Sequence, residues 1–214
     1  MSLTPVFLPA LIQSIADELE KNAQYIAALD QAIGDGDHLV NLQRGINALL
    51  AMGGELAELD WPIALKKIGM TLMTAMGGAS GSLYGTLFIA MSKAFVSQEL
   101  TIANFAIIFN EGVQAVKQRG KAEVGEKTML DVLIPVGNAL KNGVSNNLLL
   151  ADLLSEVEHT AISGMESTRD MLATKGRASF LEERSRGHID PGAKTCQLII
   201  CVIVGSLREQ ILPA

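Results

Sequence analysis

Apolar residues recur along most of the chain at the spacing of one face of an α-helix, while the alternation typical of a half-buried strand is rare. The first helical segment opens at Thr4-Pro5, where threonine is placed to cap a helix and proline to begin it. Glycine pairs, prolines and polar loops separate the later segments. The pattern predicts helices over residues 5–29, 38–52, 62–75, 82–96, 101–118, 128–141, 148–174 and 193–211.

Two of the predicted helices contain residues that compete with a continuous helix. Pro135 lies inside the sixth and is expected to kink or interrupt it, because proline lacks the amide proton. The run Ile199-Ile-Cys-Val-Ile-Val204 in the last is rich in β-branched residues, so a strand competes there. Because no linker or low-complexity segment divides the chain, we expect one all-α domain over residues 1–214 with about eight helices.

The composition agrees with helix-on-helix packing. Hydrophobic residues make up 49% of the chain and aromatic residues only 4%, so the core must be built from Leu, Ile, Ala, Val and Met. In the first predicted helix the apolar face is formed by Leu11, Ile12, Ile15, Leu19 and Ile26.

Charge and hydropathy narrow the class of protein. A formal net charge of −6 argues against a nucleic-acid partner, which usually meets a basic face. The first residues lack the features of a signal peptide, and the longest apolar run, residues 196–204, is much shorter than the roughly 20 residues of a membrane span. We therefore expect a cytoplasmic protein without a membrane partner, in which Cys196 and Cys201 are buried reduced thiols.

Three aspartates within eight residues, Asp30, Asp35 and Asp37, are the strongest chemical signal of the chain. Gly34 and Gly36 break the helix at this point, so the three carboxylates converge and repel one another unless a positive charge lies between them. Magnesium, which prefers carboxylate, water and phosphate oxygens, is the natural candidate. The alternative is that the aspartates are ordinary turn and cap residues. An EF-hand is excluded, because the third ligand position and the following glycine are absent.

Three further polar loops contain groups that suit a phosphate. Gly77–Ser82 permits close backbone approach, and Ser80 can cap the next helix or donate to a phosphate oxygen. Residues 119–129 combine glycines with basic residues, and in residues 175–192 Arg177 offers a planar fork. The alternative is that these are plain helix connections with solvated charges. No P-loop, no Gly-x-Gly-x-x-Gly after a strand and no nucleophile with a partner base occurs.

The motifs occur in a fixed order from the first predicted helix to the last. They are Gly34-Asp-Gly-Asp-His-x-x-Asn41 with Gln43-Arg-Gly45, Gly69-Met-Thr-Leu72, Gly77-Gly-Ala-Ser-Gly81, Arg119-Gly-Lys-Ala-Glu123 with Lys127-Thr-Met129, Lys175-Gly-Arg-Ala-Ser179, Glu183-Arg-Ser185 and Gly187-His-x-Asp-Pro-Gly192. This ordered set resembles the ADP-binding L subunits of the phosphotransferase-system-dependent dihydroxyacetone kinases. The resemblance implies an antiparallel eight-helix barrel with nucleotide-binding loops at one end.

The resemblance also implies a set of site residues. Asp30, Asp35 and Asp37 would bind two magnesium ions that bridge the phosphates of the nucleotide. Leu39 occupies a place where this family usually has glycine, which is expected to weaken nucleotide binding or to re-shape the loop. The ADP pocket would be formed by His38, Leu39, Val40, Asn41, Ala79, Ser80, Gly120, Met129, Arg177, Asp190, Pro191 and Gly192.

The activity implied by the resemblance is a phosphoryl relay. ADP would stay bound as a cofactor, a phosphohistidine-carrying phosphotransferase subunit would phosphorylate it in place, and the phosphoryl group would pass to dihydroxyacetone on a separate K subunit. The chain would then supply no catalytic residue, because such transfer depends on charge neutralisation and alignment. The alternatives are an ATP-dependent kinase domain with exchanging nucleotide and a nucleotide-sensing module that docks on a transcription regulator. Whether the chain forms a homodimer is left open by the sequence.

Overall fold

The computed structural model describes residues 4–95 and 100–211, and every regular element among them is a helix. The all-α prediction is thereby confirmed. The strand alternative at residues 199–204 is wrong, because these residues lie inside α10 (Pro191–Ile211). The chain divides into two compact units, the first formed by Met1–Ala16 with Val40–Lys121 and the second by Asp17–Leu39 with Ala122–Ala214.

In the first unit α6 packs against both α5 and α7. The backbones of α5 and α6 meet at Gly69 and Gly85, where an added Cβ would lie 2.9 Å and 2.8 Å, respectively, from the carbonyl oxygen of the other glycine. Larger side chains there would force the helices apart. The helices of this unit are α3 (His38–Ala51) from Val40 onward, α4 (Gly53–Ala57), α5 (Trp61–Ala75), α6 (Gly78–Ala94) and α7 (Ile102–Gly120), with the 3-10 helix η1 (Pro5–Phe7) and the start of α1 (Leu8–Lys21).

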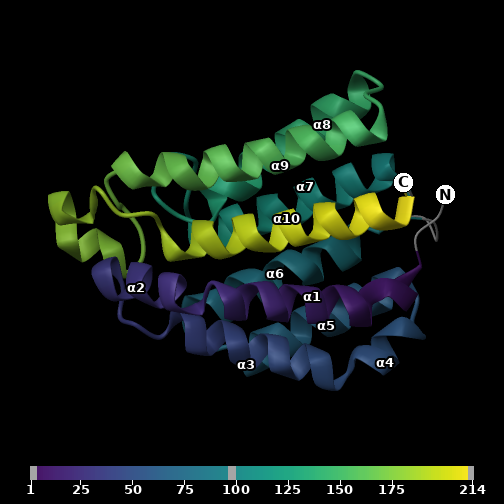
Figure 1. The fold of residues 1–214 in the computed structure, drawn as a ribbon, viewed down its shortest axis with the longest axis horizontal. Helices are drawn as coiled ribbons and strands as arrows, with labels where there is room; N and C mark the ends of the chain where they lie inside the picture. The colour runs from purple at the N-terminus through teal and green to yellow at the C-terminus, as the bar shows by residue number, and fades with distance from the viewer. Residues whose placement is uncertain (1–3, 96–99, 212–214) are drawn as a thin grey trace. The chain divides into compact units, whose positions relative to one another are not determined.

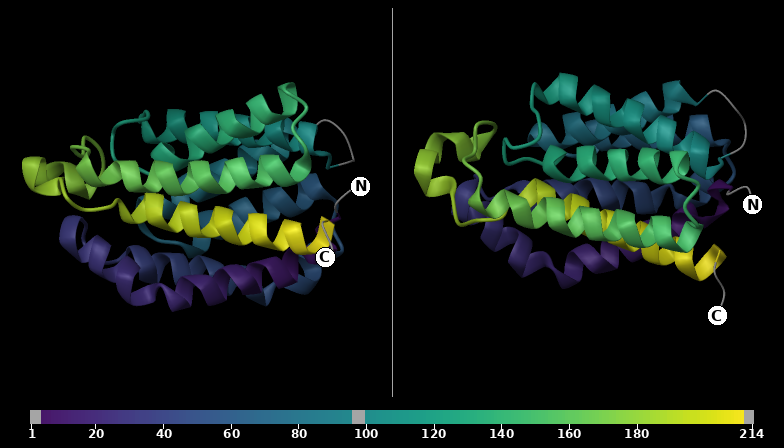
Figure 2. Two further views of the ribbon diagram at one scale, coloured as in Figure 1. Left: turned by 45° about the horizontal axis from the view of Figure 1, so that its top comes forward. Right: turned by 90° about the horizontal axis from the view of Figure 1, so that it is seen from above.

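In the second unit α8, α9 and α10 lie side by side (Figure 1). A Cβ at Gly164 of α9 would lie 2.3 Å from the backbone oxygen of Asp131 in α8, so this contact also requires glycine. Between the end of α9 and the start of α10, the chain forms a long connection that contains η3 and extends past the ends of both helices (Figure 2). The elements of this unit are α2 (Ala23–Ile33), α8 (Leu130–Ser145), α9 (Leu150–Ser167), η2 (Thr168–Asp170), η3 (Arg177–Ser185) and α10.

Several predicted boundaries are wrong. The first helix is broken after Lys21, and Thr4 makes no side-chain cap bond. The helix predicted over residues 38–52 ends at Ala51 as expected, but Gly53 and Gly54 then begin α4, which was not predicted, and α8 runs through Pro135 without interruption. The seventh predicted helix is too long, because α9 ends at Ser167 and a 3-10 turn follows.

Other predicted features are confirmed in full or in part. The side chain of Thr101 caps α7 by accepting from the Asn104 N–H at 3.2 Å. The α6 helix begins at Gly78, four residues before the expected start, and its predicted end at Val96 lies outside the described residues. Cys196 is buried as expected, whereas Cys201 is only half-buried, and neither forms a disulfide. The predicted apolar face of the first helix, Leu11, Ile12, Ile15, Leu19 and Ile26, is buried.

No helix within residues 4–95 and 100–211 combines the length and the apolar character that crossing a membrane would require.

Candidate metal and nucleotide site

The three aspartates form a cluster at the end of α2. The helix ends at Ile33, and the Gly34 N–H donates to the carbonyl oxygen of Asp30 at 2.6 Å. One carboxylate oxygen from each of Asp30, Asp35 and Asp37 lies within 4.8 Å of the others. Asp30 is buried, whereas the other two are exposed. The predicted convergence of the carboxylates is thus present in the structure.

Local backbone geometry explains why glycine stands between these aspartates. A Cβ at Gly34 would lie 1.8 Å from Oδ1 of Asp30, so any larger residue would displace that carboxylate. Gly36 has a φ of 79°, which L-residues with a side chain rarely adopt. The buried Asp30 carboxylate is held by the His38 N–H, which donates to its Oδ2 at 2.9 Å. The cluster is therefore set by the turn itself.

Arg177 contributes a positive charge to the cluster. Its Nε lies 2.9 Å from Oδ2 of Asp35, although both side chains are largely open to water. One guanidinium cannot balance three carboxylates at this separation, so the cluster still favours a further cation. Its donors are all hard oxygens, as Mg²⁺ prefers. The residues present therefore fit a bound magnesium ion.

His38 connects the aspartate loop to the start of α10. Its Nε2 lies 3.2 Å from Oγ1 of Thr195, within hydrogen-bonding distance. Burial lowers the pKa of His38, while the carboxylates of Asp30 and Asp37 oppose that change. The imidazole is therefore suited to a neutral, orienting role at this junction.

The start of α10 brings Asp190, Gly192 and Met129 together. Oδ2 of Asp190 accepts from the Ala193 N–H at 2.7 Å and so caps the helix. A Cβ at Gly192 would lie 3.0 Å from that oxygen and 3.7 Å from Cβ of Met129, so the backbone is open only because residue 192 is glycine. Pro191 between them is buried.

Asp190 makes stability depend on pH. Burial raises the pKa of Asp190 from 3.8 to about 7, although the N–H groups of Ala193 and Gly192 and the charge of Lys127 oppose the rise. The folded state thus favours the protonated acid, and the stability that this gives is lost as the pH rises through about 7. Asp190→Asn can still cap α10 but cannot lose a proton. We therefore expect the unfolding free energy of this variant, minus that of the wild type, to be more than about 1 kcal/mol higher at pH 8 than at pH 5.

Denaturant unfolding of both proteins at the two pH values measures this gain. Asp152→Asn, at an exposed position in the first turn of α9, is the control. Its unfolding free energy should differ from that of the wild type by the same amount at both pH values. Parallel pH dependence of Asp190→Asn and wild type would contradict the prediction.

In the first unit the starts of α3 and α6 and the end of α7 lie together. Asn41 is buried, and a Cβ at Gly77 would lie 2.5 Å from its Oδ1, so the turn before α6 packs directly on this amide. The Nε of Arg119, next to Gly120, donates to Oγ of Ser82 at 2.8 Å and joins the end of α7 to the first turns of α6.

The predicted site residues divide between the two units. The first unit holds Val40, Asn41, Ala79, Ser80 and Gly120. The second unit holds Asp30, Asp35, Asp37, His38, Leu39, Met129, Arg177, Asp190, Pro191 and Gly192.

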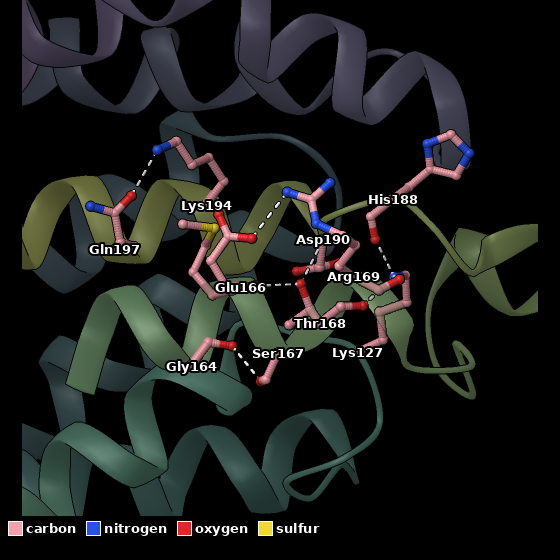
Figure 3. A network of polar contacts seen from close by, with 11 residues as sticks. Lys127, Gly164, Glu166, Ser167, Thr168, Arg169, His188, Asp190, Lys194 and Gln197 are labelled. Atoms are coloured by element: carbon pink, nitrogen blue, oxygen red, sulfur yellow. Dashed lines mark hydrogen bonds and ion pairs between the residues drawn. The ribbon is translucent and has the colours of Figure 1, made fainter. Parts of the chain in front are cut away.

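Sequence reasoning missed the organising role of Lys127. It read this residue as part of a polar loop, whereas the side chain is only 1% exposed and its Nζ donates to the backbone oxygens of Thr168 and His188. Figure 3 shows the Lys127 side chain reaching these segments. Apolar periodicity carries no signal for a buried lysine. In the sequence, its role is indicated only by its place in the motif Lys127-Thr-Met129.

Comparison with known proteins places these features in a wider context. A family model described as the DAK2 domain matches residues 32–205. The ADP-binding subunit DhaL of PEP-dependent dihydroxyacetone kinase 1 of Listeria innocua is 41% identical over 188 residues, which cover 88% of this chain and 89% of that subunit. The corresponding subunit of PEP-dependent dihydroxyacetone kinase of Escherichia coli K12 is 38% identical, covering 98% of this chain and 100% of that subunit.

A solved structure shares the fold. The crystal structure of the dihydroxyacetone kinase from C. freundii in complex with AMP-PNP and Mg²⁺ aligns with a TM-score of 0.73 at 22% sequence identity. The alignment covers 96% of this chain and 35% of that one, so this chain corresponds to one part of the longer protein.

Proposed function

Because the chain belongs to the DAK2 domain family, we propose that it is the ADP-binding subunit of a PEP-dependent dihydroxyacetone kinase. Its relatives of this name match it over nearly their whole length. The proposal takes residues 1–214 as a single L-type domain closed as an eight-helix barrel.

The observation that carries the proposal is the aspartate cluster with Arg177 beside it. Three carboxylates within 4.8 Å of one another provide ligands for magnesium, and two ions would offset most of the combined negative charge of these carboxylates and a diphosphate. Arg177 is suited to a phosphate, and the glycine backbone at Gly192, where α10 begins, is suited to close nucleotide approach. Bound magnesium would neutralise the charge that develops on the transferred phosphoryl group.

The residues of the chain would bind and orient the nucleotide rather than react with it. Asp30, Asp35 and Asp37 would hold the metal, and His38 would keep the aspartate loop against α10 through Thr195. The phosphoryl group would come from a phosphohistidine on a phosphotransferase subunit and leave to dihydroxyacetone bound by a separate K subunit. Phosphoryl transfer can proceed with positioning and charge stabilisation alone.

Reconstitution tests the proposal. Purified chain loaded with Mg²⁺ and ADP, mixed with a K subunit and a phosphohistidine donor, is expected to convert dihydroxyacetone to its phosphate with sub-stoichiometric nucleotide. Chromatography of the chain should recover tightly bound ADP, because a cofactor is retained where an exchanged substrate is lost.

The outcomes separate this proposal from an ATP-dependent kinase domain. Product formation only with stoichiometric free ATP, together with loss of nucleotide during gel filtration, would favour the exchanging kinase. No product from folded, ADP-loaded protein with either phosphoryl source would contradict both.

A further inference from the structure

The excursion between α9 and α10 is closed at its base by one buried side chain. Residues 171–187 leave the end of η2, carry η3 with Arg177, and return next to their starting point, where the Gly187 N–H donates to the Arg169 oxygen at 2.8 Å. The Lys127 Nζ donates to backbone oxygens on both sides of this base, those of Thr168 before the excursion and His188 after it. The Arg169 oxygen lies 3.5 Å from the same nitrogen.

Lys127 is placed rigidly for this role. Its backbone has a φ of 61°, and the loop that carries it is braced by the buried carboxylate of Asp131, which accepts from the N–H groups of Gly125 and Thr128 at 2.5 Å and 2.8 Å. The side chain is 1% exposed, so the ammonium cannot exchange its carbonyl partners for water. Three N–H donors facing backbone oxygens match what an ammonium group offers.

Neighbouring contacts reinforce the same base. The Asp190 N–H donates to Oγ1 of Thr168 at 3.0 Å, and this bond links the segment that follows the excursion to η2. Glu126, next to Lys127 in sequence, accepts from Oγ1 of Thr174 at 2.9 Å and so holds the outgoing part of the excursion. Figure 3 shows Lys127, Thr168, His188 and Asp190 in this network.

From this geometry we propose that Lys127 is a positioning residue for nucleotide binding, which holds the base of the 171–187 excursion and thereby aims Arg177 at the aspartate cluster. The inference rests on the proposed nucleotide site. Lys127 acts on Arg177 indirectly, through the backbone oxygens of Thr168 and His188 to which its Nζ donates. Burial lowers the pKa of Lys127, but Asp190, Asp170 and Asp131 oppose that change and favour the charged form.

Two measurements on Lys127→Met test the proposal. Hydrogen exchange of the nucleotide-free protein is expected to show about 10-fold or greater loss of protection in residues 171–187, with little change in the middle of α9 and α10. The affinity for ADP in the presence of Mg²⁺ is expected to fall about 10-fold, which is the lower end of the range of losses seen when a group that orients ligand-binding residues is removed. Lys141→Met, at an exposed lysine in the last part of α8, should change neither.

A double-mutant cycle distinguishes positioning from general destabilisation. If Lys127 acts through Arg177, most of the loss of ADP affinity caused by Lys127→Met should disappear in an Arg177→Ala background. Unchanged exchange in residues 171–187, or an equal loss of affinity in both backgrounds, would overturn the proposal. If Lys127→Met does not fold, Lys127→Gln keeps two N–H donors and carries the same measurements.

The exchange measurement is independent of the proposed function. Should the wild type bind no nucleotide, the proposed function fails, while the exchange of residues 171–187 still decides whether Lys127 holds the excursion.

Discussion

Replacing either exposed aspartate of the cluster, as Asp35→Asn or Asp37→Asn, is expected to abolish magnesium-dependent ADP binding while leaving the helical fold intact. Asparagine keeps the size of the side chain but removes the charge and one hard oxygen ligand. The loss should exceed about 100-fold, since groups that merely orient metal ligands are already worth 10- to 100-fold. Both positions lie on an exposed turn, so little stability depends on them.

Titration calorimetry with ADP, with and without Mg²⁺, measures this loss. Circular dichroism and thermal unfolding report the fold. Asp152→Asn removes an exposed aspartate from α9 and should bind ADP as the wild type does. Normal ADP affinity in Asp35→Asn and Asp37→Asn would mean that the carboxylates are only turn residues.

Removing the guanidinium in Arg177→Ala is expected to weaken ADP binding by about 10- to 100-fold, as for the loss of hydrogen bonds to a charged group. In the structure Nε of Arg177 pairs with Asp35 at 2.9 Å. A nucleotide phosphate offers this side chain a second anionic partner. The magnesium affinity measured without nucleotide should not fall, and is expected to rise, because a competing cation leaves Asp35.

Calorimetric titrations of Mg²⁺ alone and of ADP in excess Mg²⁺ separate the two effects. Arg177→Lys should recover only part of the ADP affinity, because lysine cannot make the planar two-pronged contact. Arg208→Ala, which removes the partner of Glu158 near the end of α10, serves as the control. Weaker binding of Mg²⁺ alone to Arg177→Ala would show that the guanidinium supports the metal instead of competing with it.

The fold class and the main helices were predictable because apolar spacing reports directly which face is buried. Leu11, Ile12 and Ile26 are buried as their spacing indicates. The errors lie where a local signal has two meanings. Gly53-Gly54 can end a helix or begin one, and Pro135 lies in the second turn of α8 without ending the helix. Tertiary packing decides such cases.

The site was predictable only where its chemistry is local in sequence. Asp30, Asp35 and Asp37 are close neighbours along the chain, so their convergence follows from one turn. Arg177 reaches Asp35 across more than a hundred residues, and no local pattern could pair them. Lys127 was missed for the same reason, since its partners lie on distant segments and a lysine is normally exposed.

The helical state of residues 199–204 has a consequence for the unfolded chain. Ile199-Ile-Cys-Val-Ile-Val204 carries no charge and no proline, and its β-branched side chains match the composition of segments that assemble into cross-β aggregates. In the native protein α10 packs against α8 and α9, so its backbone amides are committed to the helix. A substitution that unfolds α10 therefore exposes a segment that can pair with the same segment of another chain, and we expect such a variant to aggregate.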